Sequence, residues 1–319
     1  MELAGKIAVV TGAGDGMGRE LTRQLVEAGA RVAACDVSPG GLQGTVDAIE
    51  SGSERVSTHI VDVADEQAME QFAADVREEH DTDHIGLLFN NAGIGGGGSL
   101  FTDSRQAWDR TFNVDFFGVL NGVRAFLPLL VAADEARIVN TASVNGFWAT
   151  LGPNTPHTAY SAAKFAVKGF TEALITDLQV NAPHVTCAVV MPGHIGTGIV
   201  GNSRKVHSGN DSEVLGVDEL VVARSRIAAA GLPVEKLSDN EVAAIVADTA
   251  RQFTEKAPMT AREAAEVILD GVRADRWRIL VGTDAHALDE RVRSAPENAY
   301  TAEFYESFVD DHGWGLGTS

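Results

Sequence analysis

The chain has 319 residues, of which 45% are hydrophobic and 22% charged, with a formal net charge of −20 at pH 7. This length and composition are typical of a globular protein with one large or two ordinary domains. The negative charge argues against nucleic acid and against an anionic membrane surface as partners, because phosphate groups would be repelled. No apolar run approaches the ~20 residues needed to cross a bilayer, so no membrane partner is expected.

The N-terminus and the cysteines favour a cytoplasmic protein. Met1 is followed almost at once by an apolar, strand-like run, without the basic region or cleavage pattern of an export signal. Cys35 and Cys187 lie far apart in apolar runs and are expected to be buried thiols in a reducing compartment. No Cys/His cluster has zinc-site spacing, so no metal is expected.

Strand-like and helix-like segments alternate along the chain. An apolar run over residues 6–11, bounded by glycines, predicts a strand buried on both faces. Further strands are predicted at 30–36, 55–61, 86–90, 136–141, 184–191 and 277–281, and helices at 19–28, 39–51, 65–80, about 104–130 and 158–181. This alternation predicts a doubly wound α/β fold with a parallel sheet, whose strands all end at one ligand-binding edge.

A glycine-rich turn over residues 12–18 follows the first predicted strand and opens the first helix. Such a turn lets the backbone approach a dinucleotide pyrophosphate, and the helix N-terminus supplies N–H donors. Asp36 lies about 20 residues further on, where an acid hydrogen-bonds the adenosine ribose; the alternative is a strand-end turn former. Asp36 and Asp15 would repel a 2′-phosphate, and Arg19 is expected to point away, so NAD is predicted rather than NADP.

Tyr160 and Lys164 are four residues apart in a predicted helix, so their side chains share a face. A nearby ammonium favours the phenolate and lowers the tyrosine pKa from its usual ~10, which suits proton transfer near neutral pH. Ser143, just past the fifth strand, could orient the oxygen that exchanges the proton. The pair alone is more often a packed tyrosine beside a solvated lysine, but its place at the ligand edge favours acid–base chemistry.

Several motifs stand in the order found in the short-chain dehydrogenase/reductases. They are TGAGDGMG (11–18), Asp62-Val63, NNAG (90–93), Asn113, Ser143, YSAAK (160–164) and PGHIGT (192–197). The chain resembles this family over about residues 1–200. The resemblance implies a three-layer Rossmann fold, here a single domain over 1–319, with a seven-stranded sheet in the order 3-2-1-4-5-6-7. It also implies hydride transfer at C4 of a nicotinamide.

The resemblance implies roles for individual residues. Tyr160 is the proton donor or acceptor, Lys164 lowers its pKa and binds the nicotinamide ribose, and Ser143 polarises the substrate oxygen. Asn113 resembles the helix residue that keeps a water in a proton relay with Lys164. The other residues expected at the cofactor are Gly12, Asp15, Gly16, Met17, Gly18, Asp36, Asp62, Val63, Asn90, Ala92, Gly93, Pro192, Ile195 and Thr197.

The loop between Ser143 and Tyr160 is longer than the family pattern and should form the mouth of the pocket. Asn145, Trp148 and His157 are candidates for substrate contact, with packing of Trp148 on a neighbouring helix as the alternative. His194 is expected in the pocket wall.

Two further segments lie outside the motifs. Residues 198–260, polar at their start and helical near 217–230 and 239–256, are expected to form a mobile substrate lid insertion, or else an oligomer contact. A large lid suggests a bulky or partly apolar substrate. Residues 283–319 form a C-terminal extension whose clustered aromatics predict packing on a partner subunit of a homodimer or homotetramer.

Together these patterns predict an NAD-dependent oxidoreductase that interconverts a secondary alcohol and a ketone. One alternative is an NADPH-dependent carbonyl or 3-oxoacyl reductase, which Asp15 and Asp36 oppose. Another is a non-catalytic NAD-binding sensor, which the presence of Ser143, Tyr160 and Lys164 opposes.

Overall fold

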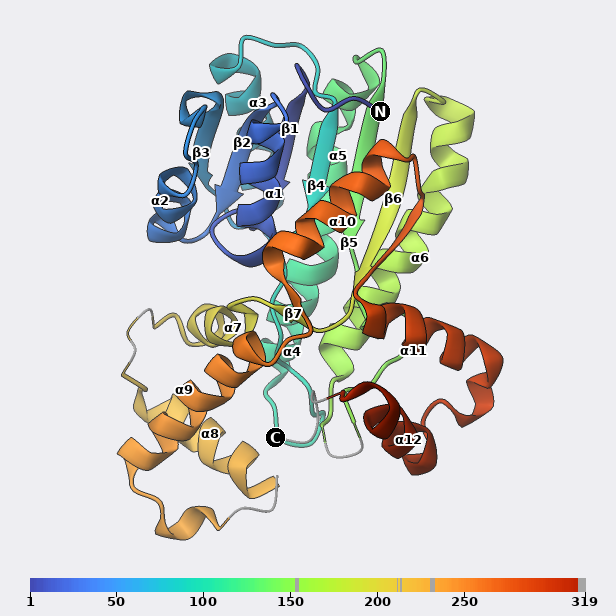
Figure 1. Cartoon of the computed structure of the whole chain (residues 1–319). Coiled ribbons are helices and arrows are strands. Elements are labelled where there is room, and N and C mark those ends of the chain that lie inside the picture. Colours follow the sequence, from blue (N-terminus) through green and yellow to red (C-terminus); the bar gives the residue numbers. More distant parts are fainter. Residues whose placement is uncertain (153–154, 211, 213, 230–232, 315–319) are drawn as a thin grey trace.

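The computed structural model describes residues 1–152, 155–210, 212, 214–229 and 233–314. A parallel seven-stranded sheet has the order β3-β2-β1-β4-β5-β6-β9 (Figure 1). The strands are β1 (Ile7–Thr11), β2 (Arg31–Asp36), β3 (Val56–Ile60), β4 (Leu87–Asn90), β5 (Ala136–Thr141), β6 (Val185–Pro192) and β9 (Arg278–Val281). The predicted order 3-2-1-4-5-6-7 is confirmed, because β9 is the seventh strand of this sheet.

Helices cover both faces of the sheet, which explains why its central strands are buried and mostly apolar. One face packs against α1 (Gly16–Glu27), α2 (Pro39–Asp47) and α10 (Ala261–Arg273), and the other against α3 (Glu66–Glu79), α5 (Gly118–Val131) and α6 (Thr158–Asn181). Side chains of β1 alternate between the two cores: Ile7 and Val9 face the second group of helices, and Ala8 and Val10 the first. The predicted three-layer Rossmann fold is therefore confirmed.

The long helix predicted at about 104–130 is a continuous helical segment with a change of pitch. It consists of α4 (Arg105–Phe112), a π-helical turn (Asn113–Phe117) and α5. By length and composition its 27 residues, with a hydropathy of 1.6, could cross a membrane, contrary to the expectation from the sequence. However, 56% of its most apolar stretch is buried inside the molecule, which is the position of a core helix.

Helix α10 was not predicted, since no helix was assigned between residues 256 and 277. It begins with a capping box, in which Thr260 accepts from the backbone N–H of Glu263 and Glu263 accepts from that of Thr260. Ala264, Ile268 and Val272, spaced four residues apart, are buried on the sheet. Both the T-x-x-E signal and this spacing could have identified the helix.

Two groups of helices lie beyond the carboxyl edge of the sheet (Figure 1). The segment predicted as a lid contains α7 (Ile199–Ser208), α8 (Val217–Ala229) and α9 (Asp239–Glu255), and the two-residue strands β7 (Ile195–Gly196) and β8 (Met259–Thr260) pair at its base. On the other side lie α11 (Thr283–Ser294) and α12 (Ala302–His312). The lid residues 211, 213 and 230–232 lie outside the described residues, as do 315–319 of the extension.

Candidate active site

The glycine-rich turn between β1 and α1 is packed too closely for side chains. A Cβ atom on Gly18 would lie 2.0 Å from the carbonyl oxygen of Gly12, and one on Gly12 would lie 2.7 Å from Cα of Ala92. Gly12 and Gly16 have φ angles of 65° and 50°, in the left-handed region that favours glycine. Met17 is partly buried against the core. The turn thus brings backbone N–H groups at the start of α1 to the carboxyl edge of the sheet.

Asp15 precedes α1 but does not cap it. Its side chain makes no capping hydrogen bond to the helix. Instead, Oδ2 accepts from the backbone N–H of Gly198 at 3.2 Å and from Nδ2 of Asn202 at 2.8 Å. The carboxylate therefore ties the turn to the start of α7, and it leaves the N-terminal N–H groups of α1 for an anion such as a pyrophosphate.

Asp36 lies against the glycine turn at the end of β2. Its Oδ2 accepts from the backbone N–H of Gly14 and its Oδ1 from that of Ser38, both at 2.9 Å. Burial raises the pKa of Asp36 above its usual value, although these hydrogen bonds oppose the shift. A carboxylate has about four acceptor positions, so two bonds leave capacity for ribose hydroxyls.

Arg19 does not point away from the turn, contrary to the expectation from the sequence. Its Nη2 donates to the carbonyl of Gly14 at 2.5 Å, and its Nε donates to Oγ1 of Thr45 at 3.2 Å. The guanidinium is held there because the turn carbonyl and the α2 hydroxyl are both acceptors. The guanidinium of Arg19 therefore binds Gly14, whose backbone N–H donates to Asp36. This positive charge near Asp36 weakens the prediction of NAD over NADP, which rests on repulsion of the 2′-phosphate.

Asp62 and Val63 follow β3 and face the helical segment α4–α5. Oδ2 of Asp62 lies 2.8 Å from Nη1 of Arg110 in an ion pair. Val63 packs so closely on α5 that a Cβ on Gly118 would lie 2.6 Å from its Cγ2. Both predicted adenine-side residues thus lie at the carboxyl edge.

The turn after β4 joins the centre of the sheet to the glycine turn. Nδ2 of Asn90 donates to Oδ1 of Asn140 at 2.9 Å, which links β4 to β5. The backbone N–H of Ala92 donates to Oγ1 of Thr11 at 3.1 Å. Gly93 has no room for a side chain, because a Cβ there would lie 3.2 Å from Nζ of Lys164. This turn therefore lies between the glycine turn, which contacts Ala92, and Lys164, which lies close to Gly93.

The chain after β6 returns to the glycine turn. Pro192 ends β6 and Ile195 belongs to β7, while Thr197 lies over the turn, where a Cβ on Gly16 would come within 2.9 Å of it. His194 is buried: its Nε2 lies 2.7 Å from the carbonyl oxygen of Phe253, and the two rings have centroids 4.6 Å apart. His194 thus anchors α9, and its place in the pocket wall stays a prediction.

The three residues predicted to exchange protons or bind the substrate oxygen come together beyond β5. Ser143 lies next to Tyr160, close enough for its hydroxyl to oppose the rise of the tyrosine pKa. Nζ of Lys164 lies 5.3 Å from the centroid of the Tyr160 ring and donates to the carbonyl of Thr141 at 3.2 Å. Lys164 is only 2% exposed, so its ammonium acts in an environment that water hardly screens.

The proton affinity of Tyr160 differs from the prediction. Burial raises the pKa of Tyr160, the negative charge of Asp115 raises it further, and the hydroxyl of Ser143 opposes both. Burial also lowers the pKa of Lys164, and Asp115 opposes that shift. In this structure burial and the charge of Asp115 therefore outweigh the opposing contribution of Ser143, and the phenol holds its proton.

Asn113 does not lie beside Lys164, so its predicted place in a proton relay is wrong. Asn113 is exposed at the end of α4. The side chain that does face Lys164 is Asp115, which is fully buried, with Oδ1 3.9 Å from Nζ. Oδ1 also accepts from the backbone N–H of Ile94 at 2.8 Å.

The prediction for Asn113 rests on the resemblance to the family and not on contacts. In the π-helical turn Asn113–Phe117, Asn113 is exposed and Asp115 is the polar residue on the buried side. One signal remained in the sequence: Asp115 stands between Val114 and Phe116, an acid among apolar residues.

Two of the predicted substrate contacts are used within the protein. Nδ2 of Asn145 donates to the carbonyls of Trp148 and Thr150, both at 2.9 Å, and so shapes the loop. Trp148 is fully buried, and its Nε1 donates to the carbonyl of Ala299 at 2.6 Å. The packing alternative therefore applies to Trp148; Pro153 and Asn154 of the same loop lie outside the described residues.

The aromatic residues of the C-terminal extension pack on this loop in the same chain. Around Trp148 lie four rings with centroids 5.9–6.5 Å from its own: Phe304, Tyr305, Phe308 and Trp314. All four are buried, whereas Tyr300 is exposed. The argument that these aromatics need a partner subunit is therefore wrong, because the loop already covers them.

His157 is the predicted substrate contact that lies beside Tyr160. The two ring centroids are 4.7 Å apart. Burial lowers the pKa of His157 to about 4, so the imidazole is neutral at pH 7. A neutral ring can donate or accept one hydrogen bond next to the phenol without adding charge.

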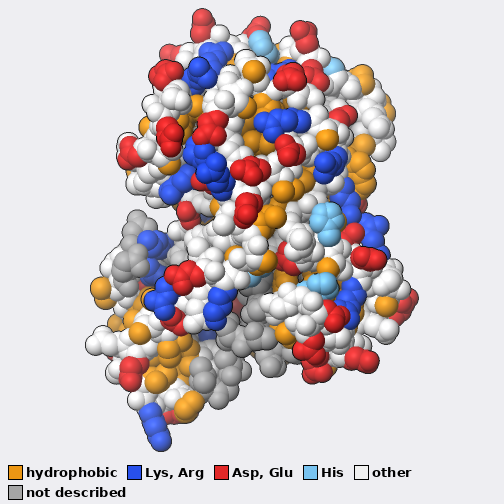
Figure 2. All heavy atoms as spheres, viewed as in Figure 1, with side chains coloured by type: hydrophobic (Ala, Val, Ile, Leu, Met, Phe, Trp, Pro, Cys, Tyr) orange, Lys and Arg blue, Asp and Glu red, His pale blue; other side chains and the backbone are white. Residues whose placement is uncertain are grey.

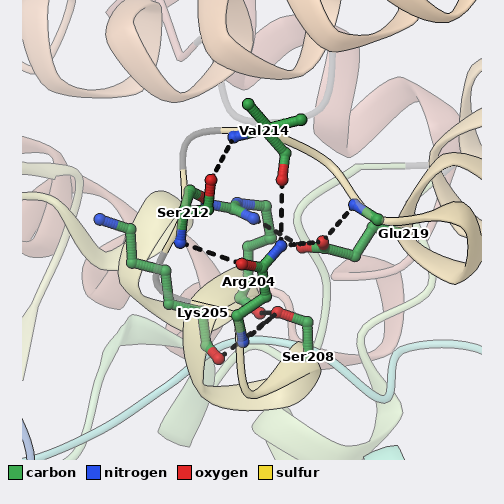
Figure 3. Close-up of polar contacts among 8 residues, drawn as sticks. Arg204, Lys205, Ser208, Ser212, Val214 and Glu219 are labelled. Carbon is green, nitrogen blue, oxygen red and sulfur yellow. Dashed lines mark hydrogen bonds and ion pairs between the residues drawn. The ribbon is translucent and has the colours of Figure 1, made fainter.

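A polar network holds the start of the lid (Figure 3). Oε1 of Glu219 lies 2.6 Å from Nη1 of Arg204, and Oε2 accepts from Asn210 Nδ2 at 2.8 Å and from the backbone N–H of Gly216 at 2.7 Å. Burial would raise the pKa of Glu219, but these hydrogen bonds lower it to about 2. The polar start of the predicted lid is thus helix α7, and the described residues Asn210 and Gly216 after it are hydrogen-bonded to Glu219.

The outer surface of the lid is apolar where α8 faces solvent. Val217, Val221 and Val222 are 79%, 63% and 46% exposed. Figure 2 shows hydrophobic atoms gathered over α8 and α9, whereas acidic and basic side chains alternate over the sheet region.

The edge of the sheet fits a dinucleotide. The closely packed glycines of the turn and the N-terminus of α1 would hold a pyrophosphate, and Asp36 would accept from ribose hydroxyls. Among the described residues, no group of three or more His, Cys, Asp or Glu side chains is placed to hold a metal ion.

Comparisons with known proteins point to one family. The family model for short chain dehydrogenase matches residues 6–207. The Mycobacterium tuberculosis protein SadH, named as an oxidoreductase, is 33% identical over 290 residues, which cover 91% of this chain and 90% of SadH. A 3-ketodihydrosphingosine reductase of Bacteroides thetaiotaomicron is 31% identical over 67% of this chain and 71% of its own length.

Solved structures agree. A short-chain dehydrogenase/reductase from Burkholderia phymatum in complex with NAD has a TM-score of 0.74 and 28% identity, over 93% of this chain and 95% of that chain. A short-chain dehydrogenase from Burkholderia cenocepacia in complex with NADP has a TM-score of 0.64 and 22% identity, over 95% of this chain and 99% of its own. The second likeness concerns the fold alone.

Proposed function

Because the chain belongs to the short-chain dehydrogenase/reductase family of oxidoreductases, which bind NAD or NADP, we propose that it interconverts a secondary alcohol and a ketone with NAD as cofactor. The observation that carries the proposal is the meeting of Ser143, Tyr160 and the buried Lys164 at the cofactor edge, with Nζ of Lys164 5.3 Å from the centroid of the Tyr160 ring. When bound, the nicotinamide would supply the hydride chemistry.

The chain's own residues would position and protonate the substrate oxygen. Ser143 would donate a hydrogen bond to that oxygen, and Tyr160 would give it a proton during ketone reduction or take one during alcohol oxidation. The raised pKa of Tyr160 supports the donor form in this structure. Lys164 would bind the nicotinamide ribose and keep it in position next to Tyr160.

NAD preference is proposed from Asp36. Its carboxylate faces the turn where the adenosine ribose would lie, and a 2′-phosphate there would bring two negative groups together. The complex of the Burkholderia phymatum relative with NAD supports this choice. Arg19 is the group that opposes it.

The substrate class is proposed as bulky or partly apolar. The lid helices α7–α9 and the loop held by α12 both lie beyond the carboxyl edge, where they would enclose a large molecule (Figure 1). His157, next to Tyr160, is proposed to contact the substrate.

The second candidate is an NADPH-dependent carbonyl or 3-oxoacyl reductase. A 3-oxoacyl-[acyl-carrier-protein] reductase of Thermotoga maritima is 30% identical over 62% of this chain, and Arg19 offers a cation beside the turn.

We also propose a cytoplasmic homodimer or homotetramer. Cys35 and Cys187 are both free and buried, which suits a reducing compartment. Phe117 and Phe165 are each 42% exposed and offer apolar surface for a contact between copies. Light scattering on the purified protein tests the oligomer, and a monomer would contradict it.

The proposed reaction is tested by following NADH formation with a panel of secondary alcohols of increasing size. Tyr160→Phe should lose almost all turnover, because the proton-exchanging hydroxyl is gone. Tyr305→Phe is the matched control, since its hydroxyl is buried without a hydrogen-bond partner among the described residues. Equal turnover by wild type and Tyr160→Phe would contradict the role of Tyr160. Tight NAD binding with no turnover of any alcohol or ketone would favour a sensor.

A further inference from the structure

A buried carboxylate faces the active-site lysine from inside the protein. Asp115 is 0% exposed and lies in the π-helical turn between α4 and α5. Its Oδ1 is 3.9 Å from Nζ of Lys164 and accepts from Ile94 N–H. Its Oδ2 is buried and has no hydrogen-bond partner among the described residues. A buried carboxylate with one unsatisfied oxygen is costly, so such a group is seldom an incidental packing residue.

The elements packed around Asp115 supply few other charges. Helix α6 contributes Lys164 and Tyr160, and the segment after β4 contributes only the N–H of Ile94. Helix α7 contributes His207, but that ring bonds the carbonyl oxygen of Gly95 at 2.8 Å. The charge of Asp115 therefore acts on the two residues of the proposed acid–base pair.

We propose that Asp115 is the counter-ion of Lys164, and that its charge sets the pH range in which Tyr160 exchanges a proton with the substrate. Asp115 is thus a positioning residue that acts through Lys164. The effect on turnover rests on the proposed function, whereas the pairing of Asp115 with Lys164 does not.

The direction of the effect follows from the charges. Burial raises the pKa of Asp115 to about 6, against the opposing pull of Lys164, so the carboxylate is ionised at pH 7. An ionised Asp115 cancels the ammonium and disfavours the phenolate of Tyr160. Asp115→Asn keeps the acceptor for Ile94 N–H but removes the charge. The uncompensated Lys164 should then favour the phenolate, and alcohol oxidation should extend to lower pH by about one unit or more.

The first experiment needs no substrate and no cofactor. Infrared spectra of the wild-type protein, recorded as the pH is lowered, should show a buried carboxylic-acid band that grows near pH 6. Asp115→Asn should lack the band. In Lys164→Met the band should persist to higher pH, because the cation that stabilises the carboxylate is gone. A band absent from the wild type, or one that Lys164→Met leaves unmoved, would overturn the pairing.

The second experiment is the pH profile of kcat/KM for alcohol oxidation in wild type and Asp115→Asn. The ionisation that limits oxidation should move to lower pH in the variant, which a merely structural defect would not cause. Asp134→Asn makes the same change of charge at an exposed position in the turn before β5, at the opposite edge of the sheet, and should leave the profile in place. An unshifted pH profile for Asp115→Asn would refute the proposal that the charge of Asp115 sets the pH range of proton exchange. If no alcohol turns over, the proposed function fails while the infrared result still decides the pairing.

Discussion

Replacing Asp36 by asparagine should change the choice between the two nicotinamide dinucleotides. The side chain keeps its size but loses its charge. The amide can accept from only one of the two N–H groups of Gly14 and Ser38 that the carboxylate binds, so part of the turn is left unpaired. Affinity for NADH should therefore fall while affinity for NADPH rises.

The magnitude follows from the charge removed. Two unit charges about 5 Å apart interact by about 3 kcal/mol at an effective dielectric constant of about 20. Partial exposure of Asp36 reduces this to about 1.4–2.8 kcal/mol, which corresponds to a shift of about 10- to 100-fold in the ratio of the two dissociation constants. Arg19→Ala in the Asp36→Asn background should reverse the gain for NADPH, because the guanidinium beside Gly14 is the nearby cation.

Quenching of tryptophan fluorescence by NADH and NADPH measures both constants on the protein without substrate. Asp47→Asn is the matched control, since Asp47 is exposed on α2 and bonds only Gln43. An unchanged ratio in Asp36→Asn would refute the assignment of cofactor choice to Asp36. Tighter binding of NADPH than NADH by the wild type would favour the NADPH-dependent reductase.

Three further outcomes are expected. Trp148→Ala should lower the free energy of unfolding by about 3–5 kcal/mol in chemical denaturation, because the indole is fully buried among four aromatic rings; a loss below about 1 kcal/mol would contradict this packing. Gly18→Ala should weaken NADH binding at least about tenfold, since its Cβ would lie 2.0 Å from a backbone oxygen, whereas Gly40→Ala, with nothing within 4 Å, should bind normally. Glu219→Gln should speed hydrogen exchange in α8 but not in α10. Because the pKa of Glu219 is lowered to about 2, its charge stabilises the lid above the unfolded-state pKa of ~4.3, and this stability should be lost as pH falls through about 2.

The sheet and most of its helices could be predicted because local patterns determine them. The buried strands are apolar runs ended by turn residues. The glycine turn between a strand and a helix indicates a dinucleotide site from the local sequence alone. That Ser143, Tyr160 and Lys164 lie together could be predicted because strand ends of a parallel sheet meet at one edge, and their catalytic roles are proposed.

The wrong predictions concern side chains whose position depends on contacts that the local sequence pattern does not indicate. The sequence around Trp148 predicts a pocket residue. In the fold, however, Trp148 is covered by the C-terminal extension, whose residues lie about 150 positions later. Arg19 folds back onto the turn because acceptors on Gly14 and Thr45 draw it there. Asp115 and not Asn113 faces Lys164, because Asp115 lies on the buried side of the helical segment and Asn113 on its exposed side, which the resemblance to the family did not indicate.

The contact between α12 and the loop after Ser143 also determines when the site is completed during synthesis. All the proposed proton-exchanging residues lie before residue 165, but the residues that pack the loop are made about 150 positions later. The residues expected at the cofactor extend to Thr197, about 110 positions before the aromatics at 304–314. At ~5–20 residues per second, the nascent chain spends roughly 5–20 s with these residues made and this loop uncovered. Exchanging only α12 and the residues after it with those of a relative would therefore change the packing of this loop, while Asp284, which accepts from the backbone N–H of His194, would keep its contact with the segment after β6.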